Sequence, residues 1–180
     1  MSRLWPHALY AEDQPYHHSI LTLHVLTRAL QGGSLLGASI GTSIFTLRHF
    51  NILTPRPRNS PSPSLITSTF TSTLLRSSST GALTGLAVLC VALPLRMRGR
   101  EEIEWRDRSW RLLENEGQME CDDWTYTGML AGGVAGATQR RALGWRGVVG
   151  GVGLGSVVGM VGYMGWRYGV KGGKRAETTV

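Results

Sequence analysis

Residues 147–159 read GVVGGVGLGSVVG, and glycine recurs there at every fourth position, at Gly147, Gly151, Gly155 and Gly159. An interior glycine costs a helix in water about 1 kcal/mol relative to alanine. In a bilayer the spacing is favourable, because small residues at i and i+4 clear one helix face for close approach of a neighbouring helix. The stretch therefore predicts a membrane-spanning helix that packs through its glycines.

Three other apolar stretches share this spacing of small residues, and we call each such row a glycine seam. They contain Gly33, Gly37 and Gly41; Ser77, Gly81 and Gly85; and Gly128, Gly132 and Gly136. The twelve glycines of the four seams are the expected helix-packing residues. A soluble glycine-rich protein with short buried strands is the alternative, and it is disfavoured because each stretch is bounded by arginine or aromatic residues.

Charge and length place the expected spans at about residues 25–47, 77–95, 124–139 and 147–168. We expect Pro94 to kink or stop the second span just before Arg96. The third span has about 16 residues and reaches about 24 Å, which is short for a hydrocarbon core of about 30 Å. It needs a thinned bilayer or shelter from its neighbours.

These spans predict an all-α, integral membrane bundle of four transmembrane helices over residues 24–168. A polar N-terminal segment, residues 1–23, precedes the bundle, and a basic tail, residues 169–180, follows it. The N-terminal segment has no recognisable cleavable presequence, because it lacks an apolar core and is not rich in arginine.

The connector between the second and third spans, residues 96–123, is dense in charges of both signs. Three acid-before-base pairs at i and i+4 predict a short helix over about residues 100–114. The pairs are Glu102 with Arg106, Glu104 with Arg108, and Asp107 with Arg111.

That short helix carries two apolar stripes instead of one. Ile103, Trp110 and Leu113 share one face, and Trp105 and Leu112 lie roughly opposite. Two stripes suit a helix between the bundle end and either lipid headgroups or another subunit. These five residues are therefore the candidate partner-binding residues, with simple anchoring at the membrane interface as the alternative.

An even number of spans places both termini and the charged connector on one side of the membrane. The proline- and serine-rich loop after the first span and the turn at residues 139–146 lie on the other side. The loop is expected to be extended in its first half, because its prolines favour polyproline II. Both loops lack acidic residues, and we expect them to face the more negative compartment.

The sequence shows no catalytic constellation, so we expect no enzyme activity, no cofactor and no small-molecule substrate. The GGVGLG run fits no dinucleotide-loop register. His7, His17, His18 and His24 are expected to be solvated or interfacial and to bind no metal. Cys90 and Cys121 are expected to be free thiols, with a disulfide as the alternative.

The spans contain no Asp or Glu, which disfavours a secondary transporter. The arginines flank the spans, so lipid phosphate and not nucleic acid is their expected anionic partner.

Four short spans with glycine seams, and termini opposite the acid-free loops, resemble the mitochondrial inner-membrane translocase (Tim) superfamily. That superfamily includes protein-import channel subunits, a four-span accessory subunit of respiratory complex I and assembly proteins. Residues 100–118, followed by Asp122, Asp123 and Trp124, are similar to an uncharacterised fungal family of small membrane proteins. The resemblance covers about residues 22–168.

The import signature places an Arg and then an Asp at fixed distances before a glycine run. Here Asp123 is one residue too far from Gly132, and Glu120 occupies the Arg position. The resemblance therefore implies a structural, accessory or assembly role in a mitochondrial inner-membrane complex, with a complex I-like accessory role favoured. The partners would be membrane lipid and other inner-membrane subunits. A subunit of a protein-import or small-solute pore is the alternative.

Overall fold

The computed structural model describes residues 5–50, 63–170 and 172, and every regular element in them is helical. The predicted all-α class is confirmed. The elements are η2 (Ala11–Asp13), α1 (His17–His49), α2 (Pro63–Met97), α3 (Glu102–Glu114), α4 (Glu116–Thr138), α5 (Arg140–Leu143), α6 (Trp145–Met164) and the π-helical turn η3 (Gly165–Val170).

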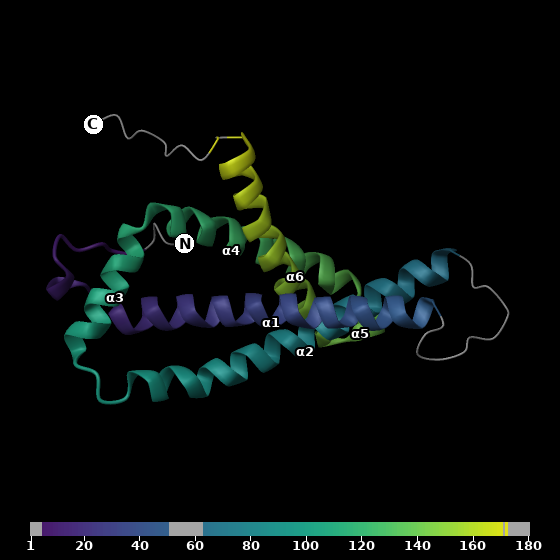
Figure 1. Ribbon diagram of the computed structural model, residues 1–180, viewed down its shortest axis with the longest axis horizontal. Helices are drawn as coiled ribbons and strands as arrows, with labels where there is room; N and C mark the ends of the chain where they lie inside the picture. The colour runs from purple at the N-terminus through teal and green to yellow at the C-terminus, as the bar shows by residue number, and fades with distance from the viewer. Residues whose placement is uncertain (1–4, 51–62, 171, 173–180) are drawn as a thin grey trace.

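Two antiparallel hairpins form the molecule, α1 with α2 and α4 with α6, and α6 also lies against α1 and α2 (Figure 1). The short helix α3 crosses one end, which we call the connector end. Phe50, the start of α2 and α5 lie at the opposite end, which we call the turn end. The chain thus passes between the two ends four times.

Three helices begin well before the starts predicted from charge. The structure begins α1 at His17, α2 at Pro63 and α4 at Glu116, where the sequence predicted starts at residues 25, 77 and 124. The predicted starts are those of membrane spans, which charge bounds, and a helix can extend beyond the span it contains, so the span boundaries stay predictions. Proline suits the first turn of a helix, where its missing N–H is not needed.

In the Ser/Thr-rich part of α2, hydroxyls are satisfied within the helix by carbonyls one turn back, as Thr73 is by Thr69 at 2.8 Å. At the other end, α2 continues through Pro94 to Met97, so the stop expected before Arg96 was placed too early. The proline-rich segment at residues 51–62 and most of the basic tail lie outside the described residues.

Within the described part of the chain, two helices are long and apolar enough to cross a membrane. They cover Thr69–Met97 and Trp145–Val170. The other two long helices, α1 and α4, fall outside that criterion; α1 contains Arg28 and Gln31, and α4 begins with an acidic stretch. Length and composition therefore support two spans among the described residues.

Candidate functional site

The α1–α2 hairpin is held at backbone contact. Gly33 lies opposite Gly81, and Gly37 lies opposite Ser77. A Cβ added to either α1 glycine would lie under 3.0 Å from a carbonyl oxygen of α2, a distance that real Cβ atoms do not adopt. Gly85 meets the carbonyl of Ala29 in the same way. Gly41 differs, because its added Cβ would meet the Ser77 side chain.

The α4–α6 hairpin repeats this arrangement with glycine on both helices. Gly128 contacts Gly155, Gly132 contacts Gly151, and Gly136 contacts Gly147, each through a backbone carbonyl; Gly159 meets the carbonyl of Trp124. The structure therefore brings together every glycine of the four seams, two seams in each hairpin. Close approach of this kind maximises van der Waals contact between helices in lipid.

A second glycine face of α6 joins the two hairpins, and sequence reasoning missed it. A Cβ at Gly150 would meet the backbone of Leu75, and one at Gly153 would meet the Ser34 hydroxyl. Both glycines are buried. They lie three residues apart and outside the seam, so a search for fourth-position spacing alone does not find them. α6 is consequently the central helix of the molecule.

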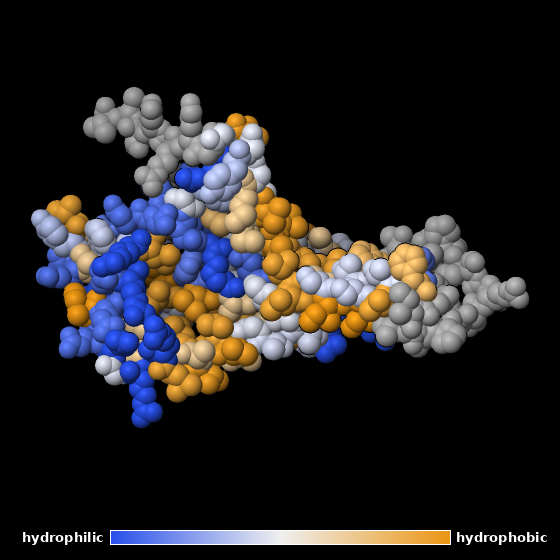
Figure 2. All heavy atoms as spheres, in the orientation of Figure 1, coloured by the Kyte–Doolittle hydropathy of each residue, from blue (hydrophilic) through white to orange (hydrophobic). Residues whose placement is uncertain are grey.

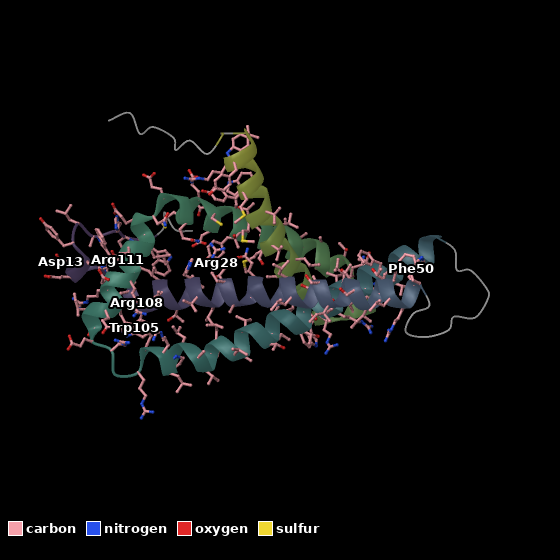
Figure 3. All side chains as sticks on the ribbon, in the orientation of Figure 1. Asp13, Arg28, Phe50, Trp105, Arg108 and Arg111 are labelled. Carbon is pink, nitrogen blue, oxygen red and sulfur yellow. The ribbon has the colours of Figure 1, made fainter. Side chains whose placement is uncertain are left out.

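A polar cluster, in which Gln31 and Asp122 are buried and the other members half-buried, lies between α1, α4 and α6. We call it the Asp122 cluster: His24, Arg28, Gln31, Gln118 and Asp122. The Arg28 guanidinium bonds Oδ1 of Asp122, and Gln118 Nε2 donates to the same oxygen at 3.1 Å. His24 Nδ1 lies 3.0 Å from Oδ2 of Asp122. Figure 3 shows Arg28 between α1 and α4.

Gln31 extends the cluster to α6. Its Oε1 accepts from Arg28 at 2.7 Å, and its Nε2 donates to the Ser156 carbonyl at 2.8 Å. Only 8% of the Asp122 side chain is exposed, so these partners take the place of water around its carboxylate. The cluster therefore fixes the position of α4 and α6 relative to α1.

The sequence alone did not indicate this cluster, because Asp122 lies in the predicted connector and the predicted spans contain no acidic residue. One signal was present: Arg28 is an isolated charge in an apolar stretch, and such a charge needs a partner.

A smaller group, Glu120, Tyr163 and Arg167, attaches the end of α6 to α4. The Tyr163 hydroxyl donates to Glu120 at 3.3 Å, and Arg167 bonds both.

The helix α3 lies close to its predicted position, and its three predicted ion pairs form. Nitrogen–oxygen distances are 2.9 Å for Glu102–Arg106, 3.6 Å for Glu104–Arg108 and 3.0 Å for Asp107–Arg111. The hydrogen bond from Arg106 lowers the pKa of the Glu102 carboxyl. The pairs thus support the helix as an exposed surface element.

The five candidate partner-binding residues divide differently from the predicted stripes. Trp110 donates to the Ala8 carbonyl at 3.0 Å, and Trp105 packs edge-on against His18. Leu113 is buried, and both it and Leu112 line a small cavity beside α1.

Ile103 is 43% exposed. The N-terminal part of the chain contacts both tryptophans, and their role in partner binding stays a prediction.

The histidines and cysteines have mostly ordinary surroundings. His7 lies 3.5 Å from Glu114 and His17 lies 3.4 Å from Glu102. His24 departs from the expected solvated state because it contacts Asp122. Cys90 is exposed, Cys121 is buried, and both are free thiols. Among the described residues, no three His, Cys, Asp or Glu side chains are grouped to hold a metal ion.

The fold and its seams define an all-α protein made of two glycine-packed helical hairpins joined through α6. A family model described as "Protein of unknown function (DUF1757)" matches residues 12–162. The chain belongs to the DUF1757 family, and the match takes in η2, both hairpins and α3. No curated protein and no solved structure matches the chain.

Proposed function

We propose that this protein is a non-catalytic, four-span membrane protein that serves as a structural, accessory or assembly component of a mitochondrial inner-membrane complex. The observation that carries the membrane part is the inverted distribution of side chains. Ser34, Ser78 and Ser156 are fully buried between the hairpins. A soluble bundle of this size would place leucine and valine there.

Large apolar side chains point outward from all four long helices. Leu36 of α1, Val88 of α2, Leu130 of α4 and Val158 of α6 are between 56% and 72% exposed. Figure 2 shows hydrophobic residues along the helices and hydrophilic ones gathered over the connector end. Exposed apolar side chains on all four long helices suit lipid. Because α1 and α4 share this feature with α2 and α6, it supports four spans.

Arginines mark the two edges of this surface. Arg76 and Arg96 bound the apolar part of α2 and are about 30 Å apart along the helix; Arg146 and Arg167 do the same for α6 at about 31 Å. Both separations equal the thickness of the hydrocarbon core, about 30 Å. We therefore place the bilayer between these two arginine levels.

Measured along α1 and α2, this placement puts Arg28 inside the membrane, whereas Asp122 lies near the edge, because Glu120, two residues before it, bonds Arg167. Ala29 lies opposite Gly85 of α2, so Arg28 lies about ten residues, or about 15 Å, from the level of Arg96. Ionisable groups are tolerated at such depth when they pair with one another and face the protein interior. Arg28 pairs with Asp122, whose side chain is 8% exposed, which supports a structural role for the pair.

Contact with other subunits is assigned to α3, which lies outside the bilayer. Its exposed Ile103 stands among paired charges, and an apolar anchor with a polar rim is the usual composition of a protein interface. The mitochondrial address and the complex I-like accessory role rest on the resemblance to the Tim superfamily. A pore ranks second, because Ser34, Ser78 and Gly153 fill the centre between the hairpins.

The proposal is tested by purifying the tagged full chain in mild detergent and identifying the proteins that migrate with it. We expect subunits of a respiratory complex in the same band. Ile103→Ser should reduce their recovery, whereas Leu9→Ser, a matched change at an exposed residue of the same end, should not. Co-migration with import components would favour the pore. Migration of the chain alone would contradict both roles.

A further inference from the structure

An apolar groove of about 740 Å³ runs along the α1–α2 hairpin, on the face turned away from the central helix α6. Arg28 and Leu89 stand at one end, and Ile40 and Ser77 at the other. From Arg28 to Ile40 the groove is about 18 Å long at the helical rise per residue.

The walls of the groove suit a narrow, apolar occupant. Gly32 lines it, and a Cβ added there would meet open space, unlike the neighbouring Gly33. The wall hydroxyls of Thr80 and Thr84 donate to carbonyls of their own helix at 3.0 and 2.9 Å. Because these hydroxyls are already bonded within their helix, a hydrocarbon chain fits the groove better than a polar ligand does.

A positively charged residue lies next to one end of the groove in the sequence of α2. Arg76 is exposed, directly precedes Ser77, and lies one turn before Thr80 on the same face of α2. The sequence contains no acidic residue between Asp13 and Glu101, so neither α1 nor α2 supplies a carboxylate to neutralise it. An anion is the complementary group at this end.

We propose that the groove binds an anionic phospholipid, with one acyl chain between α1 and α2 and the phosphate beside Arg76. One leaflet of a bilayer is about 15 Å of hydrocarbon, half of a core of about 30 Å, which matches the length of the groove. Arg76 lies at the turn-end edge of the bilayer as placed above, so this inference rests on the proposed membrane placement.

The experiment uses the full chain in nanodiscs of phosphatidylcholine with one tenth phosphatidylglycerol, followed by native mass spectrometry of the lipid that stays bound. The wild type should retain phosphatidylglycerol in excess of its share. Arg76→Gln should lower that preference about fivefold, the effect of one arginine at a membrane surface. Gly32→Leu should lower total retained lipid several-fold, because its side chain fills the groove without meeting backbone.

Two controls match these variants. Arg48→Gln removes an arginine from the same end but not from the groove mouth, and Gly165→Leu fills open space outside the groove. Equal lipid retention by Gly32→Leu, Arg76→Gln and the wild type would overturn the inference. A dimer of the chain that Gly32→Leu abolishes would also overturn it, because the occupant would be a second copy. Absence of the chain from the membrane fraction would refute the membrane placement as well.

Discussion

The two hairpins share one packing motif but differ in what lies on their outer faces. In α4–α6, glycine meets glycine at three successive steps, and α6 has a second glycine face against α1 and α2. In α1–α2, Ser77 and Ala29 replace glycine at two steps, and the outer face remains an open groove. The comparison shows that a seam fixes a pair of helices, whereas a helix with two glycine faces organises the whole bundle.

The largest effect is expected in α6. Gly155→Leu would drive its side chain into the backbone of Gly128 and Gly132, which cannot move without separating the hairpin. Overpacking of an interior costs about 1–3 kcal/mol when side chains can adjust, and here they cannot. We expect little or no folded protein by size-exclusion chromatography in detergent. Val158→Leu, on the exposed face, should behave as the wild type, and equal losses for both variants would refute the seam.

Substitutions in the Asp122 cluster should give the next largest loss of stability. Asp122→Ala removes the carboxylate that pairs with Arg28, whose side chain is 26% exposed, so the cost should lie below the about 3–5 kcal/mol of a fully buried pair. We expect a much lower Tm in detergent. The double variant Arg28→Met with Asp122→Leu removes both charges and should recover most of the loss. A double variant as unstable as the single one would show that the cluster has another function.

The seams could be predicted from the sequence because fourth-position spacing is a local property of one helix. The pairing of residues that are distant in the chain cannot be predicted in this way. Nothing near Arg28 indicates that its partner is Asp122, 94 residues away. The contacts of Trp105 and Trp110 could not be predicted for a similar reason. The N-terminal residues that cover them, Ala8 and His18, carry no pattern that predicts docking on α3.

Gly32 and Gly33, which are adjacent in α1, test the seam of the α1–α2 hairpin with smaller expected effects. Gly33→Ala places a Cβ against the Gly81 carbonyl and should destabilise the hairpin, whereas Gly32→Ala meets open space. Because alanine favours a helix over glycine by about 1 kcal/mol, Gly32→Ala should raise the Tm slightly. Opposite signs at neighbouring positions are expected in thermal unfolding. The same sign at both would contradict the assigned register of α1 against α2.

The smallest expected effect concerns α3, outside both hairpins. The pKa of Glu102 is lowered in the folded protein, so its ion pair with Arg106 stabilises the fold above the carboxyl's ordinary pKa of 4.5. That contribution is lost as the pH falls through the folded-state pKa. Glu102→Gln should therefore have a slightly lower Tm than the wild type at pH 7, and the difference should vanish in acid. A Tm difference that persists in acid would show that Glu102 stabilises the fold through packing and not through its charge.

The central claim is that all four long helices cross the membrane, and cysteine accessibility in sealed mitochondrial inner-membrane vesicles tests it directly. Single cysteines are introduced at Ser60, Glu116 and Arg141 after Cys90 and Cys121 are replaced. Four spans predict that Ser60 and Arg141 are labelled from one face and Glu116 from the other. If only α2 and α6 cross, Arg141 would be labelled from the same face as Glu116, and that result would contradict the four-span bundle.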